Sequence, residues 1–139
     1  MKTIRQSVRL LIALLFVSAC STAPVRIPEK YNLDNQLENV PHIFKFSLMS
    51  WAAVDNQSFI LQTSPNNYYL IILDIKSNRL PFSNSIQISN TGYMIWPGYN
   101  NVLVNDDGFE DSYIINKIYR FKDYEQVRAI RAQLSGGTK

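Results

Sequence analysis

The stretch that decides the fold is Tyr68-Tyr69-Leu70-Ile71-Ile72-Leu73. It is rich in aromatic and β-branched residues, which favour strands, and it is too short to predict a helix. The turn-forming residues Ser64-Pro65-Asn66-Asn67 precede it, and before that turn the apolar segment 59–63 reads as another strand. Two strands joined by a short turn are the start of a mainly β domain.

Further short strands flank this pair on both sides. The segment 42–54 begins with alternating apolar residues at Phe44, Phe46 and Leu48. Asn90-Thr91-Gly92 predicts a hairpin turn that joins one short strand to the next. The remaining strands are expected at 85–89, 93–96, 101–104 and 113–121, with a polar loop at 105–111.

The last part of the chain changes to helical periodicity. Asp123 is a candidate N-cap with Gln126 three residues later, close to a capping box. Val127, Ile130 and Leu134 fall on one face of the helix predicted at 123–134, and Arg128 and Arg131 lie off that face. The predicted fold is α+β and mainly β: a small antiparallel meander or curled sheet of about six strands. We expect the C-terminal helix to cover an open end or edge of the sheet.

Residues 1–19 have the organisation of a signal peptide, which we expect to be helical. A cationic segment, 1–9, is followed by the apolar run 10–17, which is too short to remain as a membrane-spanning helix. The small residues Ser18 and Ala19 then precede the one cysteine of the chain, Cys20.

The tetrapeptide Val17-Ser18-Ala19-Cys20 resembles the lipobox of bacterial lipoproteins. The resemblance implies cleavage between Ala19 and Cys20 and a lipid-bearing Cys20, whose acyl chains (palmitate or a similar fatty acid) hold the protein at a membrane. Ser21 in place of Asp implies sorting to the outer membrane, facing the periplasm. The alternative is an ordinary secretory leader in which Cys20 stands by chance.

Three regions follow from this organisation: the signal peptide 1–19, a lipidated N-terminus and tether 20–40, and the domain 41–139. Prolines and interspersed charges disfavour a continuous helix in the tether. Its apolar residues are candidates for docking on the domain, so part of the tether is expected to be ordered: Tyr31, Leu33 and Leu37.

The charge of the chain speaks against a nucleic-acid partner. Three of its 14 basic residues, Lys2, Arg5 and Arg9, lie in the leader, and the 11 that remain equal the 11 acidic residues. The basic character of the whole chain therefore belongs to the export signal. With Cys20 acylated, the exported domain has no disulfide and relies on packing for its stability.

Trp51-x-x-Val54-Asp55, the strands around Leu61 and 69–73, and the segment 116–121 before the helix are similar to the domain-of-unknown-function 6491 family, over roughly residues 44–134. Members are small proteobacterial lipoproteins, and many carry two cysteines that this chain lacks. The family implies location and fold and no known activity.

The acidic segment Asn105-Asp106-Asp107-Gly108-Phe109-Glu110-Asp111 is a candidate Ca²⁺ site. Its candidate ligands are Asp106, Asp107, Glu110 and Asp111, but their spacing differs from the twelve-residue calcium loop. The alternative is a solvated hairpin loop. His42 is the only histidine, and zinc or general-base chemistry requires partners that the sequence does not offer.

Aromatic residues are a second set of candidate ligand-binding residues. Tyrosine and tryptophan combine an apolar face with a polar tip, so they suit a groove for glycan, peptide or lipid. The candidates are Tyr69, Tyr93, Trp96 and Tyr99, and strand alternation predicts that about half of the aromatics belong to the core.

The expected function is that of a non-enzymatic accessory or binding domain, lipid-anchored in the bacterial envelope, with no cofactor. Its partners are the membrane, through the N-terminal lipid, and an envelope protein, glycan or lipid. Two alternatives stay open: a calcium-dependent or enzymatic module that uses segment 105–111, and a carrier of an apolar ligand inside a curled sheet.

Overall fold

The computed structural model describes residues 23–44, 47–89 and 92–136. The expected signal peptide and Cys20 lie outside these residues. The elements, in chain order, are η2 (Glu29–Tyr31), β1 (Glu38–Asn39), β2 (Ser50–Ala53), β3 (Ser58–Ser64), β4 (Asn67–Leu73), η3 (Leu80–Phe82), β5 (Ser85–Ile88), β6 (Asn101–Asp106), β7 (Phe109–Arg120) and α2 (Tyr124–Ser135).

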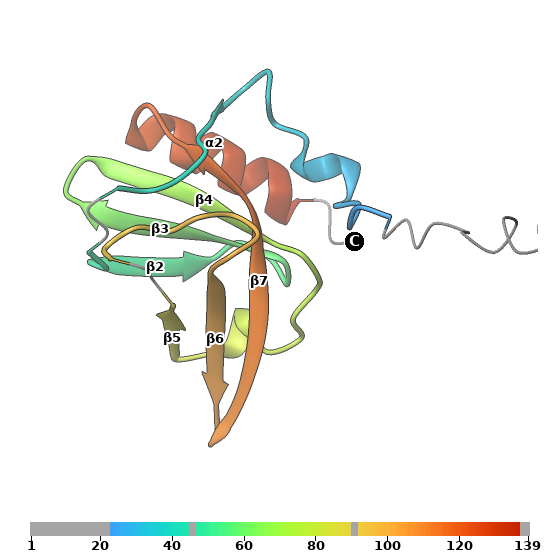
Figure 1. The fold of residues 1–139 in the computed structure, drawn as a ribbon. Coiled ribbons are helices and arrows are strands. Elements are labelled where there is room, and N and C mark those ends of the chain that lie inside the picture. The colour runs from blue at the N-terminus through green and yellow to red at the C-terminus, as the bar shows by residue number, and fades with distance from the viewer. Residues whose placement is uncertain (1–22, 45–46, 90–91, 137–139) are drawn as a thin grey trace, which may run out of the picture.

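The strands form one antiparallel sheet in the order β2-β3-β4-β7-β6-β5, and the short β1 pairs with the end of β7 (Figure 1). The sheet curls, because β5 and β6 turn away from the plane of β2, β3 and β4. This arrangement confirms the predicted mainly β fold with one C-terminal helix. The helix begins beside its predicted N-cap: the Asp123 carboxylate accepts a 2.9 Å hydrogen bond from the amide of Gln126.

The deciding strand, β4, is buried on both faces. Ile71 and Leu73 point into one core, whereas Leu70 and Ile72 point into another on the opposite side of the sheet. All four side chains are fully buried. A strand that is covered on both faces needs an uninterrupted apolar run, which explains why this stretch shows no polar alternation.

The first core, here called the curl-side core, fills the inside of the curled sheet. It joins side chains of β3 and β4 to side chains of β5, β6 and β7, together with single residues from the connections. Its buried members are Ile43, Phe59, Leu61, Ile71, Leu73, Leu80, Ile86, Ile95, Val102, Val104, Ile115 and Ile118.

The second core, here called the helix-side core, lies between the sheet and α2. Val127, Ile130 and Leu134 of the helix lie in it with Ile60 and Leu70 of the central strands. The helix therefore covers a face of the sheet, and the expectation that it covers an open end or edge is wrong (Figure 1). The physical reason is β4: its second apolar face needs a cover, and the helix supplies it.

A bulge in β7 allows this one strand to serve both halves of the sheet. Ile72 pairs with Lys117 but Leu73 pairs with Ile115, so one residue of β7 is left unpaired between them. A bulge bends its strand and shifts the side-chain alternation by one residue. Ile115 and Ile118, three positions apart, consequently both point into the curl-side core.

Two predicted strands are largely absent. Of the described part of segment 42–54, the strand is β2. Segment 93–96 forms no strand, and its Ile95 pairs with Ile43 in an isolated bridge. Gly92 and Tyr93 have φ angles of 60° and 67°, so the chain leaves the extended conformation there. The predicted hairpin into 93–96 is therefore wrong, and β5 pairs instead with β6; Asn90 and Thr91 of the turn lie outside the described residues.

The segment before β1 belongs to the folded domain. Tyr31, Leu33 and Leu37 are buried in the helix-side core. Tyr31 and Leu33 are also held through the hydroxyl of Tyr119, which donates toward the carbonyl of Tyr31 at 3.0 Å and accepts from the amide of Leu33 at 3.0 Å. Three residues expected in the tether thus form part of the core, and folded structure begins before residue 41.

A buried carboxylate holds the same segment at a second point. Asp55, in the turn between β2 and β3, accepts hydrogen bonds from Lys30 (2.7 Å), the hydroxyl of Tyr31 (2.8 Å), the amide of Gln57 (2.9 Å) and the hydroxyl of Ser58 (2.8 Å). Burial alone raises the pKa of the carboxyl, but these four donors outweigh it and lower the pKa of Asp55 below its ordinary value.

Candidate functional site

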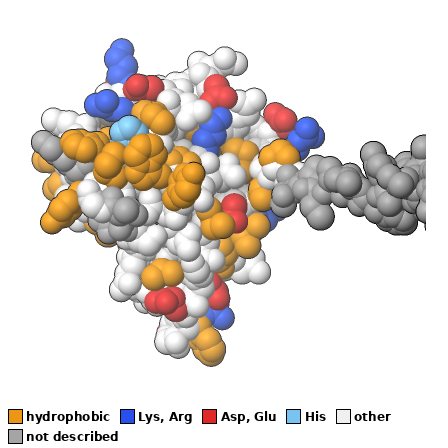
Figure 2. Space-filling model, in the orientation of Figure 1, with side chains coloured by type: hydrophobic (Ala, Val, Ile, Leu, Met, Phe, Trp, Pro, Cys, Tyr) orange, Lys and Arg blue, Asp and Glu red, His pale blue; other side chains and the backbone are white. Residues whose placement is uncertain are grey.

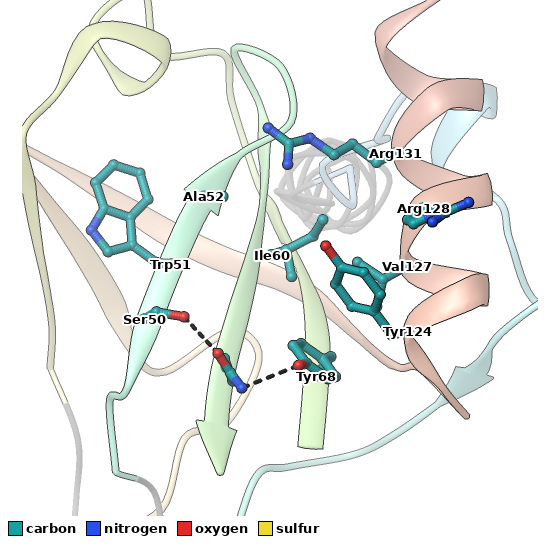
Figure 3. Close-up of a pocket in the computed structure, with 10 residues that line it drawn as sticks. Ser50, Trp51, Ala52, Ile60, Tyr68, Tyr124, Val127, Arg128 and Arg131 are labelled. Atoms are coloured by element: carbon teal, nitrogen blue, oxygen red, sulfur yellow. Dashed lines mark hydrogen bonds between the residues drawn. The ribbon is translucent and has the colours of Figure 1, made fainter. Parts of the chain in front are cut away.

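A groove of about 440 Å³ lies between α2 and the edge strand β2 (Figure 3). Ile60 and Val127 form its apolar floor, and Ser50 and Ala52 line the side of β2. Trp51 points to the opposite side of β2, toward the curl-side core, where its ring meets Phe59 edge-on with ring centroids 6.3 Å apart. The groove therefore follows from strand alternation: the small side chains of β2 face the helix, and the large one faces away.

A row of hydrogen-bonded polar side chains closes one end of the groove. The hydroxyl of Ser50 donates to Oε1 of Gln62 at 2.8 Å, and Nε2 of Gln62 donates to the hydroxyl of Tyr68 at 3.2 Å. The ring of Tyr68 lies 5.8 Å from the ring of Tyr124, at the first turn of the helix. Two tyrosines and a glutamine thus give this end both flat apolar surface and hydrogen-bonding groups.

The side formed by the helix is cationic. Arg131 extends from α2 across the groove toward β2, whereas Arg128 points along the outer side of the helix (Figure 3). Arg128 lies 3.8 Å from Glu125, an exposed pair, but Arg131 has no ion-pair partner within the described part of the chain. Among the described residues that line the groove, these two arginines are the only charged ones.

The strand on the other side presents free main-chain groups. Val54 donates a 3.0 Å hydrogen bond to the carbonyl of Ser58, the first residue of β3. Ser50 and Ala52 precede Val54 by four and two residues and lie opposite β3, so their N–H and C=O groups also face β3. Because alternate residues of an antiparallel strand bond to the same neighbour, Trp51 and Ala53 direct their N–H and C=O groups outward. Over residues 23–44, 47–89 and 92–136, no hydrogen bond reaches these outward groups.

The acidic segment forms a tight hairpin. Asp107 and Gly108 alone make the turn between β6 and β7, with φ angles of 47° and 82°, as in a type I′ turn. The predicted loop 105–111 is therefore wrong in its extent, because its outer residues are paired in the two strands.

The strand register separates the candidate calcium ligands. Asp106 and Asp111 project from one face of the hairpin, Glu110 projects from the other, and Asp107 stands in the turn. Asp111 also lies 3.3 Å from Arg79 in an ion pair. In the part of the chain that the structure describes, no three metal-ligating side chains come together.

The aromatic candidates lie in two places. Tyr69 is half-buried in β4 against the curl-side core. Tyr93 and Tyr99 are 74% and 86% exposed, on the connection that precedes β6, and Trp96 between them stacks on His42 with ring centroids 4.5 Å apart. Nδ1 of His42 is buried without a hydrogen-bond partner among the described residues. Hydrophobic side chains gather around His42 (Figure 2), but the aromatic candidates do not form one groove.

Several groove residues carry no recognisable signal in the sequence. Arg128 and Arg131 stood out only as residues off the apolar face of the helix, and nothing in their spacing indicates that one of them reaches a strand. Ala19 and Cys20, the residues expected at the cleavage and lipidation site, lie outside the described residues. None of the helices that the structure describes has the length and apolar character required to cross a membrane.

Comparison with known proteins gives one match. A sequence profile described as "Family of unknown function (DUF6491)" matches residues 1–137. No curated protein and no solved structure matches the chain.

Proposed function

This chain belongs to the family of unknown function DUF6491, and from that premise we propose that it is a lipid-anchored binding module of the bacterial envelope. Cys20 carries the lipid, and the domain faces the periplasm from the outer membrane. The family match covers residues 1–137, so it spans Cys20 as well as the folded domain.

The observation that carries the binding role is the groove between α2 and β2. It combines an apolar floor, a pair of tyrosines and Arg131, which has no ion-pair partner in the described part of the chain, beside a strand edge. Binding sites combine apolar surface with well-placed polar groups, and this groove offers both kinds of surface. Anchoring adds to its effect, because a tethered module meets envelope partners at a raised effective concentration.

The anchor is tested by the variant Cys20→Ser, with Thr22→Ala as the matched control. The wild-type protein and the control are expected in the membrane fraction, with a mass that includes acyl chains, whereas Cys20→Ser lacks the added mass. Ser21→Asp is expected to move the lipidated protein to the inner membrane. An unmodified mass for the wild-type protein would refute the anchor.

The binding role is tested by photo-crosslinking in living cells. A photoreactive phenylalanine analogue replaces Tyr124 in the groove or, as the control, Phe82, which is 78% exposed and outside the groove. We expect an adduct from position 124 that is absent from position 82 and that disappears when Arg131→Gln is added. Equal adducts at both positions, or none at position 124, would contradict the proposed role.

A further inference from the structure

We propose that the groove binds an extended segment of a partner protein, which adds as a strand to β2 and places a carboxylate against Arg131. This inference rests on the proposed binding role and names its occupant. It combines two features that meet at this place: a strand edge and an arginine that have no partner among the described residues.

The strand edge sets the conformation of the occupant. Trp51 and Ala53 offer two N–H donors and two C=O acceptors, with the spacing of a hydrogen-bonded ladder. Only another extended chain satisfies such alternating groups together, and main-chain bonds of this kind give affinity without requiring a particular sequence. The exposed edge is short, four residues, as is usual for edge strands that avoid indiscriminate pairing.

The side chains beside the edge set the chemistry of the occupant. Residues of the added strand that stand opposite Ser50 and Ala52 direct their side chains to the same face, which is the groove. Arg131 extends over this face from the helix (Figure 3). Because the charged residues that line the groove are both arginines, an acidic side chain at one of these positions is favoured.

The neighbouring residues of the added strand face the other way, toward the side of Trp51. Trp51 is half-buried against the curl-side core and leaves part of its ring accessible. The fitting segment therefore alternates acidic residues on the groove side with apolar residues on the Trp51 side.

A second copy of the chain fits this place less well. Pairing of β2 with β2 would put Ser-Trp-Ala-Ala against itself, and this strand contains no acidic residue. Arg131 would then remain without a carboxylate, and only serine and alanine side chains would enter each groove.

The test uses the full chain purified from membranes in detergent and a capped peptide of eight residues that alternates glutamate and valine. We expect the peptide to bind and to slow hydrogen exchange at the amides of Trp51 and Ala53. Arg131→Gln should weaken binding by roughly tenfold, whereas Lys76→Gln, a matched loss of charge at an exposed lysine outside the groove, should leave binding unchanged.

Two changes to the main chain test the strand pairing itself. Ala53→Pro removes an outward N–H that bonds nothing in the sheet, and it should abolish binding. N-methylation of alternate residues in the peptide makes the same test on the unaltered protein, so the result does not depend on the folding of the proline variant.

The proposal is overturned if the glutamate peptide does not bind at millimolar concentration, or if it binds equally well with glutamine in place of glutamate. It is also overturned if the protein forms dimers that Ala53→Pro dissociates, because the edge then serves a second copy. None of these results bears on acylation of Cys20, which is measured separately by mass.

Discussion

The hydroxyl of Tyr31 lies 2.8 Å from both carboxylate oxygens of Asp55, a residue 24 positions later in the chain. Tyr31 is fully buried, and the side chain of Asp55 is 7% exposed. Burial, followed by the adjacent carboxylate, raises the pKa of Tyr31, so the phenol remains protonated and acts as the donor. This contact fixes the N-terminal segment to the turn between β2 and β3.

Removal of the Asp55 carboxylate should destabilise the protein. In Asp55→Ala the hydroxyls of Tyr31 and Ser58 lose their acceptor inside the fold, so we expect the free energy of unfolding to fall by about 2–4 kcal/mol. Denaturant titration at neutral pH measures the change. Tyr31→Phe, which removes one donor and leaves three, should cost about 1–2 kcal/mol. A loss below 0.5 kcal/mol for Asp55→Ala would show that the contact does not stabilise the fold.

Stability should fall in acid because of the same carboxylate. The pKa of Asp55 is lower in the folded protein than in the unfolded chain, so its contribution is complete at neutral pH. It is lost as the pH falls from about 4, the ordinary value for aspartate, through the lower folded-state pKa. Unfolding free energies measured between pH 7 and pH 2 should therefore decrease less steeply for Asp55→Asn than for the wild-type protein. Parallel curves would assign the acid sensitivity to other groups.

Loss of the Tyr119 hydroxyl should loosen the N-terminal segment. In Tyr119→Phe the buried amide of Leu33 and the carbonyl of Tyr31 lose a common partner, at a cost of about 1–3 kcal/mol. Hydrogen exchange should accelerate over residues 29–37 while the amides of β3 and β4 keep their protection. The control is Tyr113→Phe, which changes a half-buried tyrosine of the same strand. It should leave the free energy of unfolding and the hydrogen exchange of residues 29–37 unchanged. Uniform acceleration along the whole chain would indicate global destabilisation instead.

The turn between β6 and β7 should tolerate changes at one position and not at the other. Gly108 has a φ angle of 82°, so Gly108→Ala should cost about 1 kcal/mol through backbone strain even though nothing crowds the new methyl group. Asp107→Asn keeps a residue that accepts a positive φ and should change the unfolding free energy by less than 0.5 kcal/mol. Equal effects of the two variants on the melting temperature would contradict a type I′ turn.

The strands that the sequence predicts well are those whose pattern reflects burial. Segments 59–63 and 68–73 appear almost unchanged as β3 and β4, and the capping residues place α2 to within one residue. Segment 42–54 misleads because alternation shows which side chains are apolar but not whether a partner strand lies alongside. At Ile43 the pairing among the described residues is an isolated bridge to Ile95.

The groove could not be predicted from the sequence for a similar reason. Its walls come from β2 and α2, which are more than 70 residues apart in the chain. They lie side by side because α2 packs on the second apolar face of β4. Helical periodicity identifies the buried side of α2, but it leaves the direction of Arg131 open. The calcium candidates illustrate the opposite case: residues that are neighbours in sequence separate in space when a hairpin places them alternately on two faces.

Under the proposed acylation of Cys20, the attachment of Tyr31 to Asp55 would also limit the distance between the domain and its lipid. If every residue from Cys20 to Val40 were extended, this connecting segment would reach roughly 70 Å. Because the domain holds the chain from Lys30 onward, the maximum length of the segment is roughly 35 Å. Halving a radius leaves about one-eighth of the volume to be explored. If the proposed anchor holds, a partner must come close to the bilayer to be bound, so a partner in the same membrane leaflet would be bound more often than a freely diffusing periplasmic one.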